Sequence, residues 1–87
     1  MRTLLTALTA LMLFATPVVA GDLEDGVAAL QAGDYQKAFR IWKPLAEQGH
    51  GEVQSILGWM YDNGYGVSKD DAIAVYWYRK AAEQGVA

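Results

Sequence analysis

An internal repeat is the feature of this 87-residue chain that most restricts how it can fold. When the chain is shifted against itself by 36 residues, Asp34–Gly49 (DYQKAFRIWKPLAEQG) aligns with Asp70–Gly85 (DDAIAVYWYRKAAEQG), and six of the sixteen positions are identical. Both segments carry apolar residues at helical spacing, and no polar/apolar alternation is long enough for a strand. A period of this length built from two helices is typical of an α-solenoid, whose units bury one another's apolar faces. The sequence therefore predicts an all-α fold of stacked, antiparallel helix-turn-helix pairs.

The first twenty residues differ in character from the rest. Arg2 gives the N-terminus a positive charge, and Leu4–Ala15 is a twelve-residue apolar stretch that Pro17 ends. Small residues precede Gly21, so the layout is that of a signal peptide cleaved between Ala20 and Gly21. Twelve apolar residues are too few for a bilayer, which needs about 20 in a helix. We therefore expect residues 1–20 to be removed, no stable membrane anchor to remain, and the protein to be periplasmic or secreted.

Glycines and helix-capping residues divide the rest of the chain. Residues 21–33 are expected to hold a weak leading helix over 22–31, with Asp22 as its N-cap and Gly26 lowering its stability. Residues 34–49 form the second helix of a degenerate repeat, capped by Asp34 and ended by Gly49. Pro44 lies inside this helix and predicts a kink, since the apolar face continues beyond it.

A full repeat is expected over residues 50–85, leaving 86–87 as the truncated start of another. Its first helix, over about 52–62, carries an apolar stripe, and its second runs from 71 to about 84 after the capping residue Asp70. The glycine-containing segment 63–69 joins them as a turn. The apolar face predicted for the last helix is wide and consists of Ile73, Ala74, Trp77, Tyr78, Ala81 and Ala82.

These residues resemble the Sel-one-like repeat, a relative of the tetratricopeptide repeat. The first helix has the family's L-G-x-x-Y, the loop has G-x-G-V-x-x-D, and the second helix has A-x-x-W-Y-x-x-A-A-x-x-G. The residues that carry the resemblance are Leu57, Gly58, Tyr61, Gly64, Gly66, Asp70, Ala74, Trp77, Ala81, Ala82 and Gly85. The resemblance implies a tetratricopeptide-like solenoid with a scaffolding role. Exported members with cysteines staple each repeat with a disulfide; this chain has no cysteine, so the β-lactam chemistry reported for that branch does not transfer.

No catalytic, metal or cofactor site emerges from the residue pattern. His50 lies in a turn between helices, where capping the next helix is its simplest role. Ser55 and Ser68 lack the partners that an acyl-enzyme mechanism needs. The glycines of the 63–69 segment do not form a phosphate loop or a calcium loop, because a third glycine, G-K-S/T and a ligating glutamate are all missing.

Two aromatic residues do not fit the core stripes. Trp59 projects to the polar side of its helix, and Tyr76 falls among charged residues that include Arg79. In a solenoid such residues either pack against the adjacent repeat or line a binding surface, where Trp, Tyr and Arg contribute most affinity. We take Trp59, Tyr76 and Arg79 as the candidate partner-binding residues.

The net negative charge of residues 21–87 restricts the class of partner. Residues 21–87 contain six Lys and Arg against ten Asp and Glu, which argues against nucleic acid as a partner. The function expected is that of an exported helical-repeat module, an adaptor in the cell envelope that binds a protein or peptide and catalyses nothing. Two alternatives stay open: a fragment or short paralogue without independent activity, and an envelope hydrolase acting on β-lactam or peptidoglycan. Self-association through the uncapped last helix is a further option.

Overall fold

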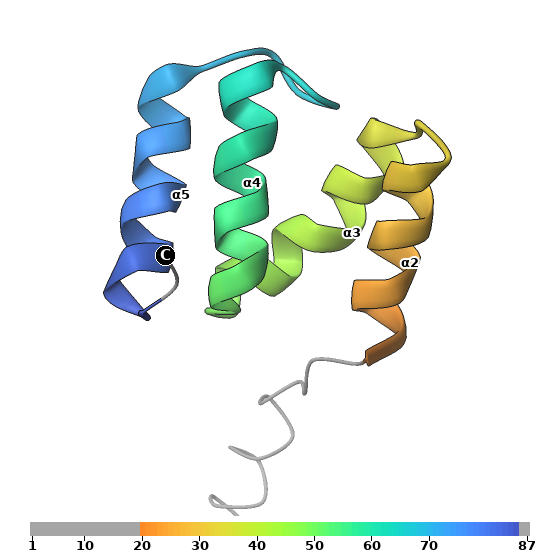
Figure 1. The fold of residues 1–87 in the computed structure, drawn as a ribbon, viewed down its shortest axis with the longest axis horizontal. Helices are drawn as coiled ribbons and strands as arrows, with labels where there is room; N and C mark the ends of the chain where they lie inside the picture. Colours follow the sequence, from red (N-terminus) through yellow and green to blue (C-terminus); the bar gives the residue numbers. More distant parts are fainter. Residues whose placement is uncertain (1–19, 86–87) are drawn as a thin grey trace, which may run out of the picture.

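Four helices make up the part of the chain that the structure, a computed structural model, describes, residues 20–85. They are α2 (Ala20–Gln31), α3 (Tyr35–Glu47), α4 (Gly51–Asn63) and α5 (Asp71–Glu83). The helices stand in one row, and each packs against its neighbours in the chain (Figure 1). Within residues 20–85 no residue belongs to a strand, which confirms the all-α class there. The predicted signal peptide, apart from Ala20, and residues 86–87 lie outside the described residues.

The chain runs up and down through two helix pairs. The turn 32–34 joins α2 to α3, and the loop 64–70 joins α4 to α5, both at the same end of the helices, the top of the view in Figure 1. The connection from α3 to α4 lies at the opposite end. The antiparallel pairs therefore stack side by side as predicted, and their two internal connections become neighbours.

Side-chain caps define where three of the helices begin. Asp34, His50 and Asp70 each accept a hydrogen bond from the backbone N–H three residues further on, at 3.2, 3.4 and 3.1 Å. Each bond satisfies a donor that the helix itself leaves unpaired. The capping roles predicted for all three are confirmed. The N-cap predicted at Asp22 is wrong: α2 begins at Ala20, and Asp22 lies in its first turn, where its carboxylate still faces the positive end of the helix dipole.

Pro44 does not break α3. The helix continues through it to Glu47, and Gly49 follows with a positive φ, as expected of the residue that ends the helix. Pro44 itself is exposed, whereas Leu45 and Ala46 beside it are buried. The apolar face therefore runs through the proline, and packing against the neighbouring helices compensates for the backbone hydrogen bond that proline cannot make.

The core lies along the row between the helices. Its buried members are Ala29, Ala38, Trp42, Leu45, Ala46, Val53, Leu57, Met60 and Trp77. On α5 the buried stripe is narrower than predicted: Ala74, Trp77 and Ala81 are buried, but Ile73, Tyr78 and Ala82 are exposed. The wide face predicted for this helix is therefore wrong. The reason is that, among the described helices, only α4 packs against α5.

In each pair, a glycine on the first helix lets an aromatic ring of the second helix approach closely. A Cβ at Gly26 would overlap the indole of Trp42, and one at Gly58 would lie 2.7 Å from the ring of Tyr78. Gly58 therefore permits the close approach of α5 to α4. Gly26 lowers helix propensity, as the sequence predicts, but its second effect is to admit Trp42, one of the two tryptophans of the core.

Glutamine side chains connect the two pairs at the end of the helices opposite the 64–70 loop. Gln54 is buried and donates to the carbonyl of Ala46 at 3.0 Å. Gln84 donates to the side-chain oxygen of Gln54 at 3.2 Å and to the carbonyl of Gly49 at 2.5 Å. These bonds run from α5 through α4 to the end of α3, and they satisfy a polar side chain that would otherwise be costly to bury.

Candidate functional site

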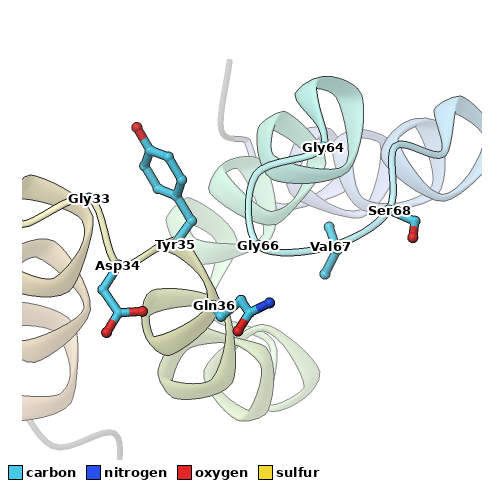
Figure 2. Close-up of a pocket in the computed structure, with 8 residues that line it drawn as sticks. All are labelled: Gly33, Asp34, Tyr35, Gln36, Gly64, Gly66, Val67 and Ser68. Carbon is cyan, nitrogen blue, oxygen red and sulfur yellow. The ribbon is translucent and has the colours of Figure 1, made fainter.

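An open cleft of about 630 Å³ lies where the two helix pairs meet. One wall is the α2–α3 turn with the start of α3, and the other is the loop before α5 (Figure 2). The lining residues are Gly33, Asp34, Tyr35, Gln36, Gly64, Gly66, Val67 and Ser68. The walls therefore come from segments far apart in the chain, which the stacking of the pairs brings together.

The loop is held against α3 by its glycines. Gly64 ends α4 in the left-handed conformation, with a φ of 72°, and Gly66 has a φ of 77°. A Cβ at Gly66 would lie 2.5 Å from the carbonyl oxygen of Tyr35, so only glycine fits where the loop crosses the first turn of α3 (Figure 2). The turn predicted for these two glycines is confirmed. Gly66 also sets the distance between the two walls of the cleft.

A ladder of three aromatic rings extends from the cleft to the surface. The ring of Tyr35 stacks on that of Tyr65, with centroids 4.7 Å apart, and Tyr65 contacts Trp59 at 4.9 Å. Trp59 is 39% exposed at the outer end. Offset and tilted rings at these distances are favourable, so the ladder holds Trp59 in place while leaving much of its surface free.

The three predicted partner-binding residues lie in two places. Trp59 is off the core, as predicted, and belongs to the aromatic ladder on α4. Tyr76 is 52% exposed on α5, where its ring contacts that of Trp77 and the ammonium of Lys80 lies 5.6 Å from its centroid. Arg79 is exposed on the same helix. Tyr76 and Arg79 thus lie on α5. Trp59 lies on α4, at the outer end of the aromatic ladder whose first ring, Tyr35, lines the cleft.

Tyr35 and Tyr65 are surface-forming residues that the sequence did not single out. Tyr35 looked like one more member of the apolar stripe of α3, and Tyr65 like a residue within a turn. Their contact depends on how the second pair stacks on the first, which no local pattern encodes. The one available signal was the pair of glycines flanking Tyr65, since two such residues indicate a loop with tightly fixed geometry.

Two side chains with titratable groups, His50 and Lys69, make structural contacts. The Nδ1 atom of His50 accepts the capping bond from the backbone N–H of Val53 in α4. The ammonium of Lys69 binds the carboxylate of Asp71 at 2.6 Å on the surface, and this hydrogen bond raises the pKa of Lys69. Among residues 20–85 no group of His, Asp and Glu side chains is arranged to hold a metal ion. No helix in that range has the length and apolar character needed to span a membrane.

Comparison with known families decides what kind of protein this is. The family model described as the Sel1 repeat matches twice, at residues 21–50 and at 51–86. The chain belongs to the Sel1 repeat family. The resemblance seen in the sequence is thereby confirmed, and each matched range coincides with one helix pair, α2–α3 or α4–α5. No curated protein and no solved structure matched the chain.

Membership in this family carries a general statement about function. Sel1 repeats are generally modules for protein–protein interaction, and the family is typically non-catalytic. In this Sel1 repeat protein, the cleft between the two repeats and the exposed face of α5 are the surfaces that such an interaction could use.

Proposed function

We propose that this protein is an exported Sel1-repeat adaptor of the cell envelope, which binds a segment of a partner protein and catalyses no reaction. The observation that supports it most is the cleft at the junction of the repeats, flanked by the exposed end of the aromatic ladder. An aromatic side chain that is fixed in place yet exposed loses little conformational entropy on binding, which is why such residues dominate affinity at interfaces.

The chemistry of the cleft fits an extended peptide. Gln36 and Ser68 supply an amide and a hydroxyl on facing walls, and Tyr35 adds the first ring of the ladder. An extended segment presents backbone N–H and C=O groups that such side chains can pair with. A side chain of the same segment would stack on Trp59, giving the binding surface one apolar anchor and a polar rim.

Photo-crosslinking can identify the partner without disturbing the fold. A benzophenone amino acid placed at Ser68, which is exposed at the cleft, is expected to capture an envelope protein, whereas the same group at Glu52 on α4 is not. The affinity of the captured protein is then measured by calorimetry against two variants. Trp59→Ala is expected to weaken binding at least tenfold, and Tyr76→Ala by less than threefold. The reverse order would move the binding surface to α5.

Export is tested separately. The prediction is that a bacterial host removes residues 1–20, so that Gly21 becomes the N-terminus of the protein recovered from the envelope fraction or the medium. Cell fractionation followed by N-terminal sequencing gives the answer. Recovery in the cytoplasm with Met1 retained would reject the envelope role, but it would not affect the proposal that the protein binds a partner segment.

We also propose that the protein self-associates through α5. The support is a set of exposed apolar side chains on this helix, which includes Val75 at 51% exposure. Sedimentation velocity over a range of concentrations tests it: the wild-type mass should rise with concentration, and Val75→Glu should remain a monomer. A monomeric wild type would reject self-association without affecting the cleft.

A further inference from the structure

The second helix of the first repeat, α3, and that of the second repeat, α5, differ in how deeply one stripe of side chains is buried. Under the 36-residue shift, three apolar positions that are buried or half-buried on α3 are apolar but exposed on α5, and a fourth, the half-buried Tyr35, aligns with the exposed Asp71. The pairs are Phe39 and Val75, Trp42 and Tyr78, and Ala46 and Ala82. The sequences remain apolar at all three positions, so the difference in burial comes from what packs against each helix.

On α3 the stripe is covered by α4. The ring of Phe39 meets the ring of Tyr61 edge-on, with centroids 5.6 Å apart, and the carbonyl of Ala46 accepts the bond from Gln54. The stripe on α5 therefore has the composition of a surface that receives the first helix of a repeat. A helix related to α4 is what the repeat geometry would place there.

At the opposite end of the row from α5, α2 is a helix of this kind. The loop in the second repeat is four residues longer than the turn in the first, so first helices are related by a shift of 32 residues. This shift places Gly26 on Gly58, the two glycines that seat aromatic rings. In the first repeat, α2 thus occupies the position that α4 occupies in the second.

The outer side of α2 contains a groove of about 340 Å³ that continues onto α3. Its lining consists of Asp25, Ala28 and Ala29 from α2, Ala32 and Asp34 from the turn, and Lys37 and Ile41 from α3. Under the 32-residue shift, the counterparts of Asp25, Ala28, Ala29 and Ala32 are Leu57, Met60, Tyr61 and Gly64. Tyr61 is the residue that receives Phe39 of α3. The groove therefore lies where a preceding second helix would pack, and its small side chains leave room for larger ones.

Charge favours α5 over a second α2 as the helix that packs against α2. The exposed surface of α2 carries three acidic residues, Asp22, Glu24 and Asp25. The exposed charged residues of α5 are Arg79, beside the apolar stripe, and Asp71 and Glu83 near the two ends of the helix, while Lys80 is half-buried. A contact between α2 and α5 brings opposite charges together, whereas a contact between two α2 helices would bring like charges together.

We infer that copies of this protein stack head to tail, with α5 of one copy packed in the groove on α2 of the next. Val75 enters the groove lined by Ala28, the exposed side of the Tyr78 ring is covered by α2, and Arg79 faces the acidic side chains of α2. The contact extends the repeat stacking from one molecule to another. It is heterologous, so it leaves a free end on every assembly. This inference rests on the proposed self-association and names the surface that receives α5.

Two blocked variants test the direction of the contact. Val75→Glu places a negative charge on the α5 stripe, and Ala28→Arg places a bulky positive charge in the groove. Both positions are exposed, so neither change should unfold the protein, which circular dichroism verifies. Each variant alone is expected to associate at least tenfold more weakly than wild type in sedimentation velocity at low salt. An equimolar mixture should form a 1:1 dimer and nothing larger, because only one pair of intact surfaces remains. Glu52→Arg, on the exposed side of α4, is the control and should associate as wild type does.

Each alternative gives a different result. If Ala28→Arg self-associates like wild type while Val75→Glu does not, α5 pairs with α5 and the inference about α2 is wrong, although self-association stands. If Val75→Glu also self-associates, α5 is not the contact surface and both proposals fail. If the wild type stays monomeric at every concentration, the α5 stripe serves a different protein, and head-to-tail stacking is rejected.

Discussion

The two Sel1 repeats use the same packing device in two different surroundings. In the first, Trp42 of α3 packs over Gly26 of α2; in the second, Tyr78 of α5 packs over Gly58 of α4. Trp42 is 1% exposed and its indole nitrogen has no hydrogen-bond partner, whereas Tyr78 is 37% exposed. The glycine admits the ring in both repeats, but only the helix of a following repeat covers it. Burial in a solenoid is therefore a property of the stack and cannot be assigned to a repeat by itself.

Removing the rings of Trp42 and Tyr78 should give the largest difference in stability between the two repeats. Trp42→Ala is expected to lower the free energy of unfolding by about 3–5 kcal/mol, because it leaves a cavity in the centre of the core. Tyr78→Ala should cost about 1 kcal/mol, since solvent already reaches that ring. Urea denaturation followed by far-UV circular dichroism measures both. Equal costs would mean that α4 contributes nothing to the burial of Trp42.

Replacing Gly26 and Gly58, over which the two rings pack, by alanine should give a smaller difference in stability between the repeats. Gly26→Ala is expected to destabilise the protein by about 2 kcal/mol, because the buried indole of Trp42 cannot move away from the new methyl group. At Gly58 the ring of Tyr78 can turn outward, and the gain of about 1 kcal/mol in helix propensity offsets the remaining strain. The same urea titrations test this, and a Gly58→Ala variant that is the less stable of the two would contradict it.

The connections of the two repeats offer a matched pair of glycines. Gly33 and Gly66 have φ values of 81° and 77°, so alanine is strained at both. Nothing lies within 4 Å of a Cβ at Gly33, whereas a Cβ at Gly66 would overlap the backbone of Tyr35. Gly66→Ala should therefore cost about 1–2 kcal/mol more than Gly33→Ala in thermal unfolding. It should also shift the fluorescence of Trp59 by displacing the aromatic ladder, and an unchanged spectrum would argue against that coupling.

The smallest expected effect concerns alkaline pH. Partial burial, and then the negative charge of Asp62, raise the pKa of Tyr78 above its ordinary value of 10.0. The folded state thus holds this proton more tightly than the unfolded state does, so its contribution to stability is complete below pH 10 and is lost as the pH rises through the folded-state pKa. Tyr78→Phe should lose less stability between pH 9 and pH 11 than wild type. Tyr76→Phe is the control, and an identical pH profile for all three proteins would contradict the assignment.

Sequence patterns predicted the local features of this fold well, because those features depend on nearby residues. The caps at Asp34, His50 and Asp70 each involve a bond to the backbone three residues away, and the off-core position of Trp59 follows from helical periodicity. The prediction for Tyr78 failed, since periodicity shows which face of a helix is apolar but not whether another helix covers it. The pairing of Tyr35 with Tyr65 was missed for a related reason: the contact exists only once the repeats are stacked.

The loop between α4 and α5 has a consequence for how the protein unfolds. In a repeat protein, total stability is the sum of what each repeat contributes by itself and what each contributes to its neighbour. The seat of Gly66 on α3 and the bond from Gln84 to Gly49 both belong to the second kind. Much of what orders the second repeat is thus lost whenever the first one opens. The two repeats should melt as one cooperative unit, with a single transition that local damage to either repeat shifts as a whole.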